Sequence, residues 1–289
     1  MLKQLREKAG VSPEAARKAI GVSPNTLWRL ETAQSVRLYP PMIERLCEVY
    51  GASEEVTQTL LGLIEEAKKP GWWHAYGDTI PKDFDLFLGL EEAAQRVVVF
   101  YMNGIPGLLQ TDEYRRAMAW VLHPNKATEE IEQRIERNAK RRERLSDPKK
   151  FSLLAILSEA ALRHRVGEPG IMIDQLQRLL EAGRLPNVSI RVIPLAVVGH
   201  LGMLVGNFTL LEFPRNKTEW LTEPPVVYVE GYTGALYLDK ESDVRQYREA
   251  CPLLERAALD EDASRELILE IVEEYRSELG SDTGEVVQE

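Results

Sequence analysis

Several features that mark other classes of protein are missing from this sequence of 289 residues. It has only two cysteines, Cys47 and Cys251, and their wide separation favours two small buried thiols over a disulfide. No apolar run approaches the length of a membrane span, and the N-terminus lacks the apolar core of a signal peptide. We therefore expect a cytoplasmic, reduced protein with no membrane association.

Motifs of catalysis and cofactor binding are also missing. The sequence has no nucleophile elbow, P-loop, dinucleotide fingerprint or HExxH zinc motif. No histidine lies at metal-ligand spacing from another; the four are His74, His123, His164 and His200. The nearest candidates are His200, in a glycine-rich loop, and the helical pair Glu159 and Arg163, which we interpret as structural. We expect no cofactor and no enzymatic activity, with an enzyme in the C-terminal half as the alternative.

The clearest pattern that is present runs from Arg17 to Glu31. A helical pattern closes at Ile20, Gly21 can take the left-handed conformation that ends a helix, and Ser23 can cap a second helix. The apolar residues of the two helices can face each other; they are Ala16, Ile20, Leu27 and Leu30. Polar and planar residues are left on the outer side: Asn25, Thr26, Trp28 and Arg29. This pattern predicts a helix-turn-helix, with an ordinary helical hairpin as the alternative.

The flanking sequence supports a small helical domain. Residues 1–9 form a helical pattern, and Val11–Glu14 repeats the Ser-Pro start signal. Further amphipathic patterns follow after Tyr39 and over residues 53–67, ending at a stop signal in residues 68–71. We predict a helix-turn-helix domain over residues 1–69 and a linker over residues 70–84.

The distribution of charge fits a DNA-binding N-terminal domain. The chain carries a net charge of −10, yet residues 1–50 hold eight Lys and Arg against five Glu, so they carry +3 and the remaining 239 residues carry −13. Because this basic excess is small, we expect one copy to bind DNA weakly and a homodimer to be needed.

Residues 1–67 resemble the Xre-type, phage-repressor-like helix-turn-helix family. The matching motifs are L-R-E-K-A-G-V-S at Leu5–Ser12 and G-V-S-x-x-T-L-x-x-L-E at Gly21–Glu31. The resemblance implies a structural ion pair between Arg6 and Glu31, behind the DNA-facing surface. It also implies a longer lead before the first helix, so we expect a few residues to precede Met1.

The helix-turn-helix suggests a set of DNA contacts. We expect one group to meet the major groove of a double-stranded operator: Ser23, Asn25, Thr26, Trp28 and Arg29. A second group is expected at phosphates: Arg17, Lys18 and Arg37.

The rest of the chain predicts a larger α+β domain over residues 85–279. Strand patterns occur at residues 96–101, 150–158, 188–194, 207–213, 225–230 and 235–238. Helical patterns occur at residues 111–121, 128–145, 159–164, 171–182, 240–258 and 262–279. Strands in the middle flanked by helices indicate the α+β class, and residues 280–289 are expected to form a disordered tail.

One predicted helix, residues 128–145, is unusually basic in its second half. The basic residues are Arg137, Lys140, Arg141, Arg142 and Arg144. Because acids are interleaved with them, we interpret this helix as solvated or partner-facing rather than as a phosphate site.

Residues 85–276 resemble the C-terminal domain of bacterial antitoxin-like transcriptional regulators. The shared motifs are I-P-G-L-L-Q-T-x-x-Y at Ile105–Tyr114, E-A-A-L-R at Glu159–Arg163, P-N-V at Pro186–Val188, L-L-E-F-P at Leu210–Pro214 and V-Y-V-E-G at Val227–Gly231. In that family a neighbouring gene encodes a small acidic protein, and the two products are thought to bind each other. The resemblance therefore implies a regulator with a small protein partner.

A small-molecule sensor is the alternative to control by a protein. The candidate pocket residues are those of Gly199–Gly206 with Tyr228, Tyr232 and Tyr237. Partner binding requires an exposed apolar surface, whereas a ligand requires an enclosed pocket with a few converging polar groups.

Overall fold

The computed structural model describes residues 1–31, 39–68, 72, 82–215 and 222–282. These described residues fall into two compact units, the first within residues 1–72 and the second within residues 82–282. The first unit is helical and the second combines helices with a sheet, which is the fold class that the sequence predicts.

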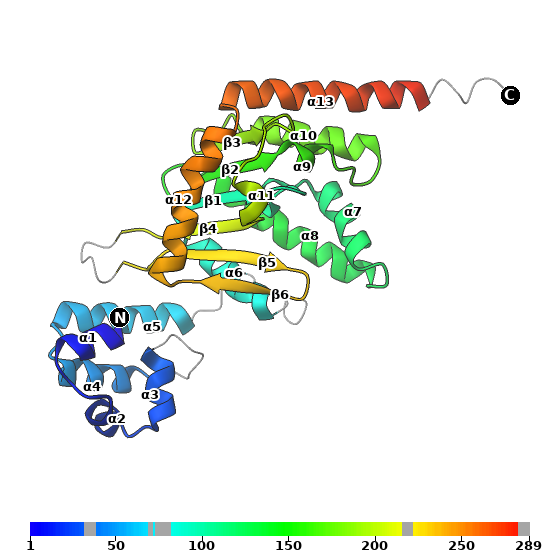
Figure 1. The fold of residues 1–289 in the computed structure, drawn as a ribbon. Coiled ribbons are helices and arrows are strands. Elements are labelled where there is room, and N and C mark those ends of the chain that lie inside the picture. The colour runs from blue at the N-terminus through cyan, green and yellow to red at the C-terminus, as the bar shows by residue number, and fades with distance from the viewer. Residues whose placement is uncertain (32–38, 69–71, 73–81, 216–221, 283–289) are drawn as a thin grey trace. The chain divides into compact units, whose positions relative to one another are not determined.

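The first unit is a bundle of short helices around an apolar core (Figure 1). Its helices are α1 (Leu2–Lys8), α2 (Pro13–Ile20), α3 (Pro24–Glu31), α4 (Pro40–Tyr50) and α5 (Glu54–Lys68). The buried side chains recur at helical spacing: Leu2, Ala16, Leu27, Leu30, Ile43, Leu46, Cys47, Tyr50, Val56, Leu60 and Ile64. Prolines open α2, α3 and α4 at positions where the missing N–H leaves no helical bond unmade.

In the second unit, the strands that the structure describes form one six-stranded sheet of order β3-β2-β1-β4-β5-β6. The strands are β1 (Arg96–Tyr101), β2 (Ser152–Ser158), β3 (Val188–Ile193), β4 (Phe208–Glu212), β5 (Val226–Gly231) and β6 (Gly234–Leu238). Strands β1, β2 and β3 pair in parallel, and β4, β5 and β6 extend the sheet from β1 by antiparallel pairing. Since β5 is antiparallel to β4, it runs in the same direction as β1.

Helices connect the parallel strands and cover both faces of the sheet (Figure 1). They are α6 (Lys82–Ala93), η2 (Gly107–Leu109), α7 (Asp112–Leu122), α8 (Thr128–Arg142), η3 (Glu143–Ser146), α9 (Glu159–Arg163), α10 (Pro169–Ala182), α11 (Gly202–Val205), α12 (Glu241–Ala257) and α13 (Glu261–Asp282). The crossover from β1 to β2 contains α7 and α8, and the crossover from β2 to β3 contains α9 and α10. Parallel neighbours require such long connections.

Alternate residues of β1 point into two different cores. Val97 and Val99 lie in the core formed with α6, α7, α10 and α13, whereas Val98 and Phe100 lie in the core formed with α12. The sheet is therefore the middle of three layers. Both cysteines are buried free thiols, Cys47 in the first unit and Cys251 in the second.

The structure corrects one interpretation, that the basic half of α8 is solvated or partner-facing. Arg137 and Arg141 are only 3% and 6% exposed. Arg142 and Arg144 donate to the carbonyls of Gln110 and Ala94, outside their own helix. The acids interleaved in α8 are thus not the main partners of these guanidinium groups.

Two predicted boundaries differ from the observed elements. Helix α6 begins at Lys82, inside the range expected for the linker, and α13 extends to Asp282, past the predicted start of the tail at Gly280.

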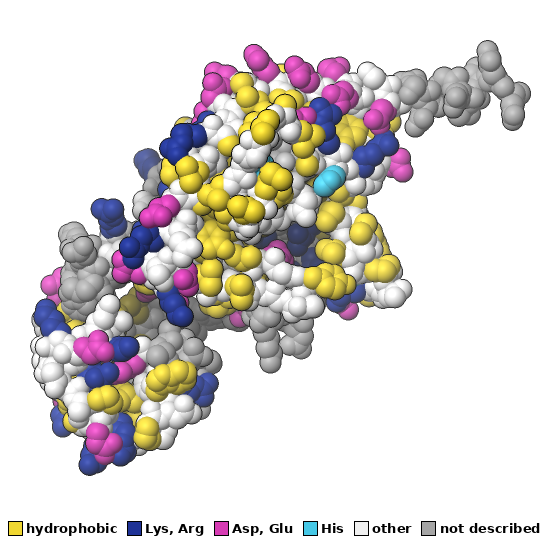
Figure 2. Space-filling view, viewed as in Figure 1, with side chains coloured by type: hydrophobic (Ala, Val, Ile, Leu, Met, Phe, Trp, Pro, Cys, Tyr) yellow, Lys and Arg dark blue, Asp and Glu magenta, His cyan; other side chains and the backbone are white. Residues whose placement is uncertain are grey.

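Acidic side chains line the exposed side of α13, as Figure 2 shows; they are Glu261, Asp262, Glu266, Glu270, Glu273, Glu274 and Glu278. This helix accounts for a large part of the negative charge of the second unit.

Candidate functional site

The turn between α2 and α3 has the geometry that its glycine allows. Gly21 has φ 67°, and its N–H donates to the carbonyl of Lys18. The N–H of Val22 donates to the carbonyl of Arg17 at 3.1 Å. These two bonds form a Schellman motif, in which a left-handed residue satisfies the last carbonyls of a helix. The motif ends α2 and fixes the direction in which α3 leaves.

Ser23 fixes the start of α3 through its side chain. Its Oγ accepts from the N–H of Thr26 at 3.1 Å and lies 2.9 Å from the Thr26 Oγ1. Both predicted groove residues therefore hold the N-terminus of the helix in place, and Thr26 is half-buried.

The outer side of α3 presents the other predicted groove residues to solvent. Trp28 is 57% exposed, and Asn25 and Arg29 are exposed as well, while Leu27 and Leu30 are buried against the bundle. Among the described residues, Arg29 has no ion-pair partner. The helix thus presents a free guanidinium, an amide and an indole on one side.

Behind this surface, Arg6 and Glu31 join α1 to the end of α3. The Nε and Nη2 atoms of Arg6 donate to the two carboxylate oxygens of Glu31 at 2.7 and 2.9 Å, and both side chains are buried. The hydrogen bond to Glu31 raises the pKa of Arg6. Tyr50 donates a longer bond of 3.5 Å to the same carboxylate. The pair fixes α3 on the bundle and leaves no free group for DNA.

The residues predicted to contact phosphate are already paired. Arg17 makes two 2.6 Å hydrogen bonds with Glu14, and Lys18 lies 3.2 Å from the same carboxylate. Both cations lower the pKa of Glu14. Arg37 lies outside the described residues. Glu14 therefore reduces the positive charge that α2 presents.

The structure places the nearest catalytic candidates in structural contacts. Arg163 donates to Glu159 at 2.6 Å, and Glu159 also accepts from the backbone N–H of Leu195. His200 packs edge-on against Phe100. Across the part of the chain that the structure describes, no group of three His, Cys, Asp or Glu side chains is arranged to hold a metal ion.

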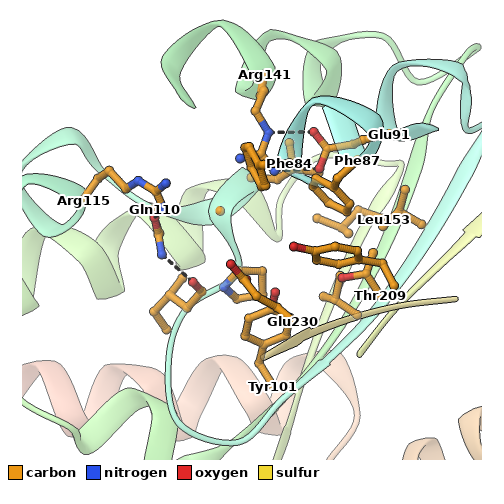
Figure 3. Close-up of a pocket in the computed structure, with 17 residues that line it drawn as sticks. Phe84, Phe87, Glu91, Tyr101, Gln110, Arg115, Arg141, Leu153, Thr209 and Glu230 are labelled. Atoms are coloured by element: carbon orange, nitrogen blue, oxygen red, sulfur yellow. Dashed lines mark hydrogen bonds and ion pairs between the residues drawn. The ribbon is translucent and has the colours of Figure 1, made fainter. Parts of the chain in front are cut away.

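A polar cavity of about 100 Å³ lies in the second unit (Figure 3). Its polar lining comes from Tyr101, Gln110, Arg115, Thr209 and Glu230, none of which the sequence singles out as a pocket residue. Of the predicted pocket residues, only Tyr228 lines it. Tyr232 is 98% exposed, and Gly202 packs against Phe100 on the opposite face of the sheet.

A buried ion pair forms one wall of this cavity (Figure 3). The Nε and Nη2 atoms of Arg141 donate to the Glu91 carboxylate at 2.7 and 2.8 Å, and its Nη1 donates to Asn138 at 3.0 Å. Its guanidinium carbon also lies 5.5 Å from the ring centroids of Phe84 and Phe87. The sequence contains one signal for this buried polar wall. Ile131 and Ile135 mark the buried side of α8, and Asn138 lies on the same side because it follows Ile131 at i+7.

Comparisons with known proteins agree with the two units. Residues 1–60 match a helix-turn-helix domain family, and residues 84–270 match the family described as a domain of unknown function, DUF5753. Neither the curated proteins nor the solved structures give a match. Among the described residues, no helix has the length and apolar character needed to cross a membrane. The helix-turn-helix supports a DNA-binding regulator, and the second match covers more than half of the chain, so this chain belongs to the DUF5753 family, with a helix-turn-helix domain at its N-terminus.

Proposed function

We propose that this chain is a sequence-specific transcriptional regulator that binds its operator as a homodimer and is controlled, in an antitoxin-like manner, by a small acidic protein. It acts in the cytoplasm and catalyses no reaction. The observation that carries the proposal is the outer side of α3, where Asn25, Trp28 and Arg29 are exposed on a helix fixed by the Arg6–Glu31 pair. Such a helix can enter the major groove of DNA and present its side chains to base edges.

Arg29 provides the test of sequence reading. A guanidinium that binds guanine O6 and N7 contributes about 1–3 kcal/mol of discrimination, and a phosphate contact contributes none. Arg29→Ala should therefore weaken binding to the upstream DNA by this amount and remove discrimination at one base pair. Fluorescence anisotropy with the native duplex and a set of single-base variants measures both effects.

Arg45→Ala is the matched control, because Arg45 is an exposed arginine of α4 that pairs with Glu48. It should change binding far less than Arg29→Ala. An equal loss for Arg29→Ala on every duplex would make Arg29 a backbone contact. No binding to any duplex by the intact chain would refute the regulator proposal.

An exposed apolar surface supports control by a protein partner. Four side chains around α11 are strongly exposed, and hydrophobic atoms gather in this region in Figure 2; they are Leu195, Val198, Met203 and Leu204. Contiguous apolar surface on a soluble unit commonly marks a protein interaction site. The acidic side of α13 would repel an acidic partner, so the α11 surface suits such a protein better.

The partner is tested by size-exclusion chromatography with light scattering, on the chain alone and mixed with the small protein encoded next to it. We expect a dimer that shifts to a larger complex, and loss of the complex in the double variant Val198→Ser and Leu204→Ser. Leu236→Ser, at an exposed leucine of β6, is the control and should leave the complex intact. A chain that ignores the neighbouring protein would refute control by that protein.

A small-molecule-sensing regulator is the second candidate, and the cavity favours it. The cavity combines an apolar wall with a few converging polar groups, the composition that small-ligand sites share.

A further inference from the structure

The cavity lies where the topology of the sheet changes direction. Strand order proceeds from β1 to β2 and β3 on one side and from β1 to β4, β5 and β6 on the other. Tyr101 ends β1, and Glu230 lies near the end of β5, which runs the same way, so both line the cavity from the carboxyl ends of their strands. In open α/β sheets, ligands bind outside the carboxyl ends of strands at such a switch point.

The floor of the cavity is a row of side chains across three strands. Val99 pairs with Thr209, and Thr209 pairs with Tyr228, so the three point to the same face. The ring centroid of Phe87 lies 4.4 Å from that of Tyr228, with the two rings tilted, and extends the apolar wall. The small apolar part of a ligand could therefore pack against this floor.

Arg115 supplies a positive charge that no carboxylate neutralises at hydrogen-bond distance. Its Nη1 donates to the Gln110 Oε1 at 3.1 Å, and the Gln110 Nε2 is itself fixed on the carbonyl of Ile105. Within the described residues Arg115 has no ion-pair partner. Burial lowers the pKa of Arg115 to about 10, with Arg141 contributing, so the guanidinium remains charged at neutral pH. A half-buried guanidinium held by a neutral amide is suited to an incoming carboxylate.

Tyr228 adds a buried donor. Its side chain is 4% exposed and lines the cavity, yet its hydroxyl has no hydrogen-bond partner among the residues that the structure describes. A tyrosine hydroxyl can both donate and accept, so one that borders a cavity without a partner in the protein is available to a ligand there. It can donate to the same carboxylate.

Glu230 supplies the opposite charge at the mouth. It lines the cavity while remaining exposed, and it has no ion-pair partner among the described residues. Burial and then the charge of Glu230 raise the pKa of Tyr101 to about 12, and both residues line the cavity. Arg141 and Glu91 form an ion pair with each other, so Arg115 and Glu230 are one charge of each sign at the cavity that no ion pair holds among the described residues.

We propose that this cavity binds a small α-amino acid, with its carboxylate at Arg115 and the Tyr228 hydroxyl, its ammonium toward Glu230, and its side chain on the apolar floor. The inference rests on the second candidate function and names its ligand class. A zwitterion satisfies both charges, whereas an anion leaves Glu230 facing a like charge. Since an apolar cavity of about 150 Å³ holds benzene, a volume of about 100 Å³ limits the ligand to roughly the size of glycine, alanine or serine.

The test is isothermal titration calorimetry on the full chain without DNA. L-alanine is the probe, and propionate and ethylamine are the same skeleton without the ammonium or without the carboxylate. We expect L-alanine to bind, and each of the other two to bind about tenfold more weakly or worse, since charged hydrogen bonds contribute that much. L-tryptophan, which exceeds the volume, should not bind.

Two pairs of variants localise the site. Arg115→Gln and Tyr228→Phe should each weaken alanine binding about tenfold. Arg116→Gln, at the next position of α7, removes a half-buried arginine that pairs with Glu113 and Glu132 outside the cavity, and Tyr232→Phe alters an exposed tyrosine beyond β5. Both controls should bind as the original chain does.

Specific outcomes overturn the proposal. Propionate binding as tightly as alanine would exclude the role of Glu230, and heat from none of the probes would exclude an amino-acid site. Operator binding is measured separately by anisotropy, with and without L-alanine. A chain that binds DNA but not alanine refutes this inference alone, and one that binds alanine but not DNA refutes the regulator proposal alone.

Discussion

The ion pair between Glu91 and Arg141 allows a quantitative test of how the second unit is stabilised. Its side chains are 4% and 7% exposed, and the carboxylate accepts two hydrogen bonds from the guanidinium. Removing one partner of a buried pair leaves an uncompensated charge and costs about 3–5 kcal/mol. Glu91→Gln has the same shape and keeps one acceptor, so we expect the lower end of this range, about 3 kcal/mol.

This loss converts into a measurable shift of the melting temperature. For a domain of roughly 200 residues, 1 kcal/mol lowers Tm by about 2–4 °C, so Glu91→Gln should lower it by about 6–12 °C. The matched control is Glu132→Gln, because Glu132 forms a bidentate pair with Arg116 on the surface. Exposed pairs contribute about 1 kcal/mol or less, so this variant should shift Tm by at most about 4 °C.

Differential scanning calorimetry of the full chain is the suitable assay, because two units are expected to give separate transitions. Glu91→Gln should lower only the transition of the second unit. A shift no larger than that of Glu132→Gln would refute the reasoning, since it would mean that water or a rearranged side chain compensates Arg141. A shift of both transitions would mean that the two units unfold together.

Two further predictions concern paired charges. Glu14→Gln should release Arg17 and Lys18 for phosphate contacts and so tighten operator binding at low salt. The slope of log K against log salt should steepen by about 1–2. An unchanged slope in anisotropy titrations would show that neither cation reaches DNA. Burial raises the pKa of Glu212, but hydrogen bonds from Arg96 and Arg248 outweigh it and lower the value overall, so this carboxylate stabilises the fold above the ordinary pKa of about 4.3 and loses that effect as pH falls through its lowered value. Melting curves of Glu212→Gln should therefore depend less on pH below about 4.3 than those of the original chain, and parallel curves would contradict this assignment.

Local chemistry explains why much of the fold is predictable from the sequence. Ser23 and Pro24 start a helix and Gly21 ends one through interactions within a few residues, and the strand Arg96–Tyr101 has the β-branched and aromatic composition of a buried strand. The residue that caps α7 is less certain from the sequence. Thr111 and Asp112 are adjacent and both residue types can cap a helix, and the structure shows the Thr111 hydroxyl accepting from the N–H of Tyr114.

The candidate sites depend on contacts between residues far apart in the chain, and these the sequence does not display. Arg141 reads as a surface residue because its buried partner, Glu91, lies fifty positions away in another helix. The cavity combines α6, α7 and α8 with four strands, and its polar members are ordinary residues in each segment taken alone. Only the register of β4 and β5 aligns Thr209 with Tyr228.

The motif I-P-G-L-L-Q-T at residues 105–111 is visible in the sequence and also builds one wall of the cavity. A Cβ on Gly107 would lie 2.9 Å from the Arg141 Nη1, so a side chain here would require Arg141 to shift from its bonds with Glu91 and Asn138. The Gln110 side chain holds Arg115, and the buried amide of Gln175 bonds both the carbonyl of Leu109 and the N–H of Thr111. Fixing the backbone of this loop costs conformational entropy. A loop that only connected two elements could remain more mobile and would not pay this cost. The stretch that carries the resemblance therefore holds two arginines in fixed positions around a cavity, which is the preorganisation that recognition of a small charged ligand requires.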